Sequence, residues 1–177
     1  VNRNELFISV NLLHDNQPWQ TGFVETVVWQ LNKWDGYNGD SLRTELHSGI
    51  NTNGRPVRNL CPVEHGGLPT QTNSMQFVSD RNLDASNDTI FLVTIGDTAN
   101  SPTQSINVVM LESNISYFAP IPADQPGAGG FLQTNDARIL GAFMVNNMIQ
   151  FVCASLDTST GNNGVYHGVI QNPTTSP

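Results

Sequence analysis

Charged residues are scarce in this 177-residue chain: they make up 12% of it, and only seven residues are lysine or arginine. About a quarter of an ordinary soluble protein is charged. A protein that follows the phosphates of a nucleic acid needs a clustered basic face. Here the few cations are scattered and the net charge is −8. The composition therefore argues against nucleic acid, and against an anionic membrane surface, as partners.

Long apolar runs and helical periodicity are also missing. No stretch approaches the ~18–20 continuous apolar residues of a transmembrane helix, so we expect a chain that does not span a membrane. The first five residues show no signal-peptide pattern, which fits a mature or excised segment. Apolar residues do not recur at the i, i+3, i+4 spacing of an amphipathic helix, and alanine and glutamate are sparse. We therefore expect few helices.

Cysteine is limited to Cys61 and Cys153, which both lie among apolar neighbours. In an oxidising compartment they would form a disulfide, but two buried free thiols fit the pattern equally well. The sequence leaves both alternatives open. Cys61 and His65 have the residue types of a thiol–imidazole pair, but no helix N-terminus that would activate the thiol is evident. We therefore expect no cysteine nucleophile.

Short runs rich in Val, Ile, Phe and Thr recur along the chain. They alternate with turn dipeptides such as Asn-Gly and Asp-Gly, in which glycine tolerates a positive φ. This serial pattern predicts an antiparallel all-β fold in a single region that covers residues 1–177. The segments 42–72 and 120–134 are rich in Gly and Pro. We predict that both are long loops that present functional contacts.

The runs group into three blade-like units, at about 5–45, 73–111 and 131–171. An internal period of this size indicates a β-propeller or, less often, a β-sandwich. The run Ile90–Val93 is apolar throughout, which is typical of strands buried on both faces, as in stacked blades. We expect antiparallel, β-propeller-like blade repeats, with a β-sandwich as the alternative.

The C-terminal third carries the pattern D-x-R-I-x-x-A-F, a turn, I-x-F-V, and a Gly-rich turn before G-V-Y-x-G-x-I. The residues concerned are Asp136, Arg138, Ala142, Phe143, Ile149, Phe151, Val152, Gly161, Gly164, Tyr166 and Gly168. In this order they resemble a blade of large secreted bacterial proteins that carry β-propeller-like repeats and are exported by the type IX secretion system. Val165 stands where that pattern has isoleucine, a conservative departure.

The resemblance covers about residues 73–170 and rests on strand pattern rather than on a chemical motif. It implies a β-propeller-like fold and a secreted, extracellular or cell-surface location, and it implies no activity. Propellers use ~4–8 blades, so three units would make a partial propeller. We therefore expect the chain to be part of a longer chain or of an assembly.

Aromatic residues beside Asn and Asp in predicted loops indicate where a ligand would bind. Aromatic rings stack on sugars, while neighbouring amides and carboxylates hydrogen-bond to the hydroxyl groups. Among the histidines, His65 is the best candidate for a binding residue, since it precedes Gly66-Gly67 in a long predicted loop. The alternatives are that the aromatics cap the core and that the histidine is an ordinary loop residue. The candidates are Trp34, Tyr37, Trp19 and His65.

Two oxygen-rich, glycine-containing loops, 35–40 and 157–163, are candidate calcium sites. Calcium takes six to eight oxygen ligands, including backbone carbonyls. The candidate ligands are Asp35, Asp40 and Asp157. Neither loop fits the EF-hand pattern, and Asx-rich turns without a metal are the more common alternative. No other cofactor is predicted.

Motifs of an enzyme active site are missing. The four histidines lack metal-ligand spacing, and no G-x-S-x-G nucleophile motif occurs. Asp136 and Arg138 lie two residues apart at a strand start, so their side chains share one face, and we predict a structural ion pair or a hydrogen-bond anchor. Glycoside hydrolysis needs two carboxyl groups at a set separation, and nothing in the spacing selects a pair. The loop carboxylates are Asp35, Asp40, Glu45, Glu64 and Asp124.

These observations favour a secreted or cell-surface, non-catalytic scaffold or binding module. Its predicted role is adhesion or polysaccharide binding, with a surface glycan or another protein as partner. The first alternative is an extracellular hydrolase that acts on glycans through loop carboxylates. The second alternative is a structural component of a surface or secretion assembly.

Overall fold

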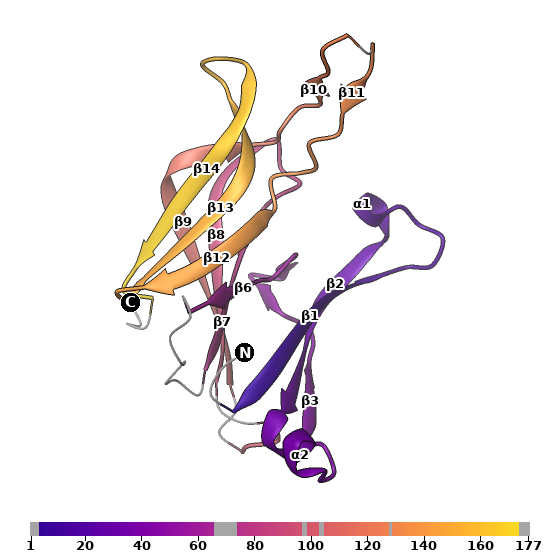
Figure 1. The fold of residues 1–177 in the computed structure, drawn as a ribbon, viewed down its shortest axis with the longest axis vertical. Helices are drawn as coiled ribbons and strands as arrows, with labels where there is room; N and C mark the ends of the chain where they lie inside the picture. The colour runs from indigo at the N-terminus through magenta and orange to yellow at the C-terminus, as the bar shows by residue number, and fades with distance from the viewer. Residues whose placement is uncertain (1–3, 66–73, 97–98, 103–104, 128, 174–177) are drawn as a thin grey trace.

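The chain folds almost entirely into β-strands. The structure is a computed structural model, and it describes residues 4–65, 74–96, 99–102, 105–127 and 129–173. Strands take up 60% of the chain and helices only 5% (Figure 1). Within these described segments, no helix is long and apolar enough to cross a lipid bilayer. The predicted all-β class is confirmed.

The N-terminal part forms a three-stranded antiparallel sheet in the order β1-β2-β3. Its strands are β1 (Glu5–Leu13), β2 (Phe23–Asn32) and β3 (Thr44–His47). A four-residue helix, α1 (Trp19–Gly22), lies between β1 and β2, and a six-residue helix, α2 (Lys33–Asn38), follows β2. Because β2 separates the two helices, they lie at opposite ends of this sheet (Figure 1).

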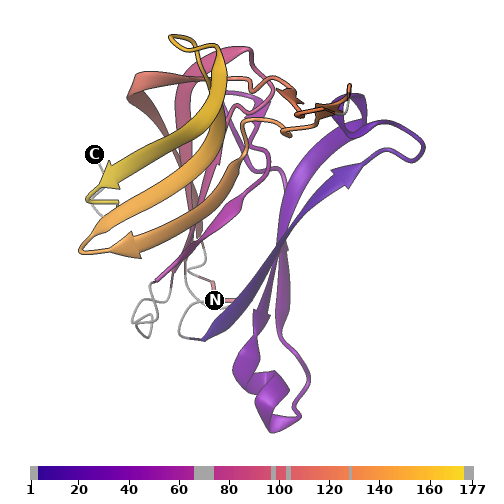
Figure 2. The same ribbon diagram turned by 45° about the horizontal axis from the view of Figure 1, so that its top comes forward.

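A second, seven-stranded sheet has the order β14-β13-β12-β6-β7-β8-β9. Its strands are β6 (Cys61–Glu64), β7 (Met75–Asp80), β8 (Ser86–Gly96), β9 (Ser105–Phe118), β12 (Ile139–Val145), β13 (Met148–Asp157) and β14 (Asn162–Gln171). All neighbours are antiparallel except β6 and β12, which pair in parallel. The sheet curls into a half-barrel, so its two edge strands, β9 and β14, come round toward each other (Figure 2).

Two predicted loops contain more regular structure than we expected. The segment 42–72 holds β3, β6 and a small hairpin of β4 (Asn51–Thr52) and β5 (Arg55–Pro56), so the loop prediction is wrong for these strands. Residues 66–72 of that segment lie outside the described part. The segment 120–134 is mostly loop, with one small hairpin of β10 (Ala123–Asp124) and β11 (Phe131–Leu132). These strands are too short to show periodicity, and β6 is held by its partners β7 and β12.

Two apolar clusters form the core, one on each side of β7 and β8. The first lies inside the half-barrel and consists of Val63, Val78, Ile90, Leu92, Tyr117, Ala137, Ile139, Ala142, Ile149, Phe151 and Cys153. The second lies between the half-barrel and the N-terminal sheet and consists of Val28, Ile50, Val57, Leu60, Met75, Phe77, Phe91, Val93 and Ile95. Strands β7 and β8 are therefore covered on both faces, which explains the unbroken apolar run Ile90–Val93.

Local sequence explains the tight hairpins of β12–β14. Asn146 and Asn147 adopt φ values of 50° and 58°, and this left-handed pair forms the two-residue turn that matches the twist of a hairpin. Gly168 pairs with Phe151 across β13 and β14. A Cβ atom on Gly168 would lie 2.1 Å from Cζ of Phe151. Glycine at this position therefore lets the aromatic ring fill the half-barrel.

A network of partly buried polar side chains connects the two sheets. Thr26 Oγ1 donates to Asn11 Oδ1 (2.6 Å), and Asn11 Nδ2 donates to Asn59 Oδ1 (2.6 Å). Asn59 Nδ2 then donates to Asn82 Oδ1 (3.0 Å), and Asn82 Nδ2 donates to Asp136 Oδ2 (2.9 Å). This chain of hydrogen bonds runs from the N-terminal sheet to the start of β12. It supplies directional contacts that an apolar interface between sheets lacks.

The predicted blade-like units overlap with three antiparallel meanders, β1–β3, β7–β9 and β12–β14. The second and third meanders belong to one sheet, since β6 pairs with both β7 and β12. Separately stacked blades would instead form separate sheets. The structure therefore confirms the all-β class without confirming a propeller blade repeat.

Candidate functional site

Trp34 and Tyr37 lie side by side on α2. Their ring centroids are 5.7 Å apart and their planes are inclined by 74°, which is an edge-to-face contact. Trp34 is 50% exposed and Tyr37 is 75% exposed. These two rings therefore present a surface to solvent and do not cap the core. We call the pair the aromatic platform.

Local hydrogen bonds define the backbone that carries the aromatic platform. Asn32 Oδ1 accepts from the backbone N–H groups of Trp34 (3.1 Å) and Asp35 (3.2 Å), as an N-cap residue does. Gly39 ends the helix at a φ of +74°, which glycine adopts without strain. The Asp35 carboxylate accepts two hydrogen bonds from the Arg43 guanidinium, both 2.9 Å long. The turn is thus anchored at its start, its middle and its end.

Charge around the aromatic platform is largely paired. The Arg43 guanidinium holds the pKa of the Asp35 carboxyl below its usual range, and Asp35 raises the pKa of Arg43 in return. Lys33 Nζ lies 5.8 Å from the centroid of the Trp34 ring, which is a cation–π distance. Trp34 Nε1 donates to Asn4 Oδ1 (3.3 Å). Chemically, the platform offers exposed rings for stacking with an amide and an ammonium group beside them.

The predicted calcium ligands lie in two separate turns, as the sequence placed them: Asp35 and Asp40 in the turn of α2, where Asp40 N donates to the Asp35 carbonyl (2.9 Å), and Asp157 at the end of β13. The Asp35 carboxylate is occupied by Arg43, and the side chain of Asp157 accepts from Ser159 and Thr160 in its own turn. The helix α2 and the β13–β14 turn lie at opposite ends of the molecule (Figure 1). In the described segments, no group of three His, Cys, Asp or Glu side chains is arranged to hold a metal ion. Asp40 is exposed on the loop after α2.

The other two predicted ligand-binding residues belong to different regions. Trp19 begins α1, at the far end of the β1–β2 hairpin from α2 (Figure 1), and its side chain lies outside the described part. His65 directly follows β6 and is half-buried. Burial lowers the pKa of its imidazole, because the charged form loses hydration. The structure therefore joins Trp34 to Tyr37 and leaves Trp19 on another element.

Both cysteines are free thiols in the structure, so the disulfide alternative is not formed. Cys61 lies on β6 and Cys153 on β13, and β12 lies between these strands. Two strand spacings amount to about 9–10 Å, whereas the Cα atoms of a disulfide are usually no more than about 7 Å apart. Burial raises the pKa of Cys61 to about 11 and that of Cys153 to about 12. Neither thiol has the character of a nucleophile.

A buried acid that the sequence did not single out is Asp80, the last residue of β7. It is 3% exposed, and neither carboxyl oxygen has a hydrogen-bond partner in the described part. Burial and, to a smaller extent, the nearby Asp136 raise its pKa to about 8. Arg138 binds Asp136 at 2.7 Å, which confirms the predicted structural ion pair and keeps the pKa of Asp136 low. The sequence gives no sign of this burial, because Asp80 is followed by the polar residues Arg81 and Asn82, a pattern that is typical of an exposed turn.

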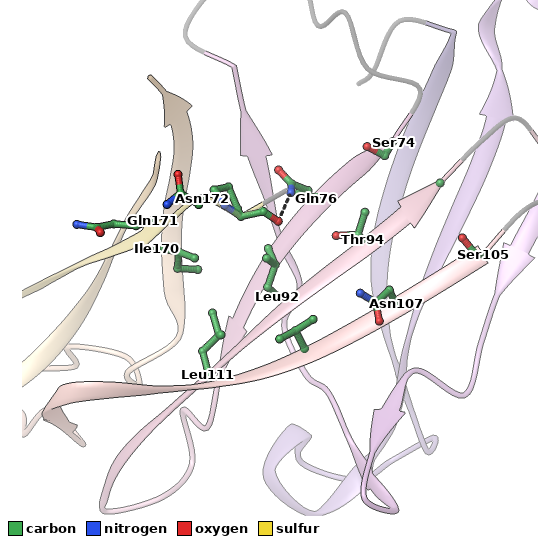
Figure 3. Close-up of a pocket in the computed structure, with 13 residues that line it drawn as sticks. Ser74, Gln76, Leu92, Thr94, Ser105, Asn107, Leu111, Ile170, Gln171 and Asn172 are labelled. Carbon is green, nitrogen blue, oxygen red and sulfur yellow. Dashed lines mark hydrogen bonds between the residues drawn. The ribbon is translucent and has the colours of Figure 1, made fainter. Parts of the chain in front are cut away.

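A groove between β9 and β14 was also not predicted. One cavity of about 730 Å³ is lined by both strands. A second cavity of about 510 Å³ adjoins it and shares Leu111, Ile170 and Gln171 with it (Figure 3). No signal in the sequence could have revealed this groove, since it exists only because the sheet curls and brings its first and last strands together.

Comparisons with known proteins give no relative from which a function could be transferred. No protein-family model, no curated protein and no solved structure matches the chain. A functional interpretation therefore depends on the geometry and chemistry of the residues described above.

Proposed function

We propose that this chain is a non-catalytic, carbohydrate-binding module of a secreted or cell-surface protein, and that the aromatic platform is its binding surface. The exposure of Trp34 and Tyr37 on a turn anchored at three points carries this proposal. Exposed apolar side chains that cluster on a surface often mark a binding site. The Trp34 and Tyr37 rings are in contact, and each is at least half exposed, so we infer that a ligand covers them. Binding to a turn that is already ordered costs little conformational entropy.

The form of the platform suits a polysaccharide chain better than a single sugar. Neither ring lines any of the five main cavities of the described segments. An exposed ring outside any cavity can stack against the apolar face of one sugar unit while neighbouring units of a chain contact the second ring. A monosaccharide needs an enclosing pocket to bury enough area. The nearby Asn4 amide and Lys33 ammonium could hydrogen-bond to hydroxyl groups.

Charge and burial favour binding over hydrolysis. Asp80 and Asp136 are neighbouring carboxyl groups whose pKa values are shifted in opposite directions, as an acid and a base would require. However, Asp80 is only 3% exposed. A substrate would need contact with both groups. The hydrolase alternative therefore stays a prediction without support from this pair.

The experiment that tests the proposal is a binding survey against soluble and insoluble polysaccharides. We expect at least one to bind, and we expect Trp34→Ala and Tyr37→Ala each to weaken that binding about tenfold or more, as loss of an aromatic anchor does. Trp29→Ala is the matched control, because Trp29 is also 50% exposed but lies on the flat face of β2. Equal binding by all three variants would reject the platform as the site.

A second candidate function, a structural component of a surface assembly, is favoured by the outward face of the N-terminal sheet. Its inward residues Phe7, Ser9 and Asn11 contact the rest of the protein. The alternate residues form an apolar surface, each 40% exposed or more, that consists of Leu6, Ile8, Val10, Leu12, Trp29 and Leu46. An apolar patch of this size often marks a protein contact, and Glu25, which pairs with Leu12, is a charged residue on the same face. Ile8→Lys should raise solubility and abolish any assembly that uses this face.

We also infer export to the cell surface and membership of a larger, propeller-like protein from the C-terminal strand pattern. Support comes from the composition, which is low in charge and rich in Asn, Gln, Ser and Thr. A structure of the longest natural chain that contains this segment tests the propeller. A closed ring of separate blades would support it, whereas a half-barrel retained in the longer chain would refute it.

A further inference from the structure

The two edge strands of the seven-stranded sheet approach each other without forming a ladder. β9 and β14 are the last strands on either side of the sheet order. Between them lies the 730 Å³ cavity, which is lined by residues 111–115 of β9 and 165–171 of β14. We call this cavity the edge groove. The adjoining cavity extends it past Ile170 and Gln171 toward the ends of β7, β8 and β14 (Figure 3).

One end of the edge groove is closed by side-chain contacts. The Tyr166 hydroxyl donates to the backbone carbonyl of Ile115 (2.9 Å), so it accepts from Ser113 Oγ at 2.5 Å. The Tyr166 ring is held by edge contact with Tyr117 and by packing on Phe151. The two edges are thus joined at this end by a tyrosine rather than by backbone hydrogen bonds. They diverge toward the other end (Figure 2).

The hydrogen-bonding groups on the free edge of β14 can be assigned from its register. The backbone N–H of Asn172 donates to the carbonyl of Asn147, which makes this a hydrogen-bonded pair of the β13–β14 ladder. Such pairs alternate along an antiparallel ladder. The even-numbered residues of β14 therefore bond to β13. The backbone N–H and C=O groups that point into the edge groove belong to Val165, His167, Val169 and Gln171.

β14 also lacks the features that normally protect an edge strand. Its pairing with β13 is continuous over ten residues, from Asn162 to Gln171, without a bulge. It contains no Pro, Lys, Arg, Asp or Glu. Natural proteins usually place a charge, a proline or a bulge on an exposed edge to prevent pairing with another chain. A long, regular, uncharged edge beside a groove is instead the arrangement that accepts an added strand.

The lining of the edge groove indicates what kind of strand would fit. Its floor is apolar and includes Ile90, Leu111, Phe151 and Ile170. Glu112 is the one carboxylate among the residues that line the groove, and Lys and Arg are absent from the lining. Alternate side chains of an added strand would face this floor and solvent. The complementary ligand is therefore apolar at alternate positions, free of acidic residues, and carries one Lys or Arg opposite Glu112.

We propose that the edge groove binds an extended peptide segment of another protein, which adds to β14 as an eighth strand and occupies the opening of the half-barrel. The peptide is held by hydrogen bonds to the backbone N–H and C=O groups of Val165, His167, Val169 and Gln171. The apolar floor of the groove selects apolar side chains of the peptide. This interaction is separate from the aromatic platform, which lies on α2, between β2 and β3 of the three-stranded sheet.

The test uses the whole chain and a capped eight-residue synthetic peptide of alternating valine and threonine with one lysine near its centre. Fluorescence anisotropy of a labelled peptide measures binding, and hydrogen exchange locates it. We expect binding that saturates below 1 mM and slower exchange of the amides of Val165, His167, Val169 and Gln171. The matched probe has the same side chains but N-methyl groups on alternate backbone nitrogens. It should bind at least about tenfold more weakly, since each lost backbone bond alone is worth up to about tenfold.

Two variants of the protein test whether the backbone of β14 holds the peptide. Val169→Pro removes one N–H from the free edge and leaves the β13–β14 ladder intact, and it should weaken binding of the peptide about tenfold. Val169→Thr keeps the N–H and should bind as the parent does. Trp34→Ala should also leave peptide binding unchanged, so that failure of the carbohydrate proposal and failure of this one can be told apart.

Three results would overturn the proposal. The first is no binding of the valine–threonine peptide at 1 mM. The second is equal affinity for the N-methylated probe, which would show that side chains alone are bound. The third is protection from exchange that appears outside β14, for example on the face of β1. Should Val169→Pro fail to fold, the pair of probes on the parent protein still decides the question.

Discussion

Gly168 of β14 lies directly beneath the ring of Phe151, the residue with which it pairs on β13. The ring is 3% exposed and belongs to the cluster inside the half-barrel. It reaches that position by crossing β14 at Gly168, where no Cβ atom stands in its way. This relationship links a glycine of the C-terminal strand pattern to the packing of the core.

Gly168→Ala should therefore destabilise the protein. The new methyl group would force Phe151 to move, and overpacking of this kind costs about 1–3 kcal/mol in free energy of unfolding. The measurement is denaturation by urea, followed by fluorescence. Gly141→Ala is the matched control, because nothing lies within 4 Å of the added Cβ there. A similar loss in both variants would show that backbone flexibility, not the ring, decides the effect.

Asp80 should make the protein less stable as pH rises. Its pKa is about 8 in the folded state and near 3.8 when unfolded, so the folded state holds an extra proton between these values. The stability present below pH 4 is lost as pH increases toward 8, by up to about 1.4 kcal/mol per pH unit.

Asp80→Asn should remove this part of the pH dependence, as measured by urea denaturation at pH 5, 6, 7 and 8. Comparison with the parent isolates Asp80, because the other titrating groups contribute to both proteins. One of them is His47, whose pKa is lowered by burial and which changes stability with pH in the opposite direction. Asp124→Asn, at an exposed position of β10, serves as the control. An unchanged slope in Asp80→Asn would mean that the carboxyl is hydrated in solution.

The two thiols should react slowly with alkylating reagents. Their raised pKa values, about 11 for Cys61 and about 12 for Cys153, leave little thiolate at pH 8. We expect iodoacetamide to label half-buried Cys61 slowly, and buried Cys153 only after denaturation, as followed by mass spectrometry. Rapid labelling of Cys153 in the folded protein, or a disulfide under non-reducing conditions, would contradict the structure.

Arg43→Gln should loosen the aromatic platform without touching its rings. The variant loses the two guanidinium bonds to Asp35 that anchor the middle of the turn. If the platform binds polysaccharide, affinity should fall by roughly three- to tenfold, because an ordered surface binds at a lower entropic cost. Near-ultraviolet circular dichroism should show a weaker signal from the Trp34–Tyr37 contact. Full affinity with a weakened signal would mean that the ordered turn is unnecessary.

Local pattern was enough to predict the strands that pair with their neighbours in sequence. The alternation in β1, the unbroken apolar run in β8 and the Asn146-Asn147 turn are each encoded within a few residues. The pairing of β6 with β12 joins residues about eighty positions apart, and nothing local signals it. That single pairing turns two meanders into one sheet, and it separates the observed half-barrel from the predicted blades.

The candidate site shows the same division. Trp34 and Tyr37 could be recognised because both belong to one turn, whose cap and glycine are local features. Trp19 and His65 were candidates from other segments, and the structure places Trp19 on a different helix and His65 directly after β6. The calcium prediction did not anticipate that Arg43 would occupy the Asp35 carboxylate.

By itself, the sequence determined the all-β class, the short turns and the lack of a basic surface, because composition and period-two patterning act within single strands. Only the tertiary structure decided that the Asp80 carboxyl lies buried with no hydrogen-bond partner among the described residues, that the cysteines are separated by β12, and that β9 and β14 form a groove. The physical reason is that burial and strand order depend on which distant segments pair. That choice is made by the sum of many weak contacts over the whole chain.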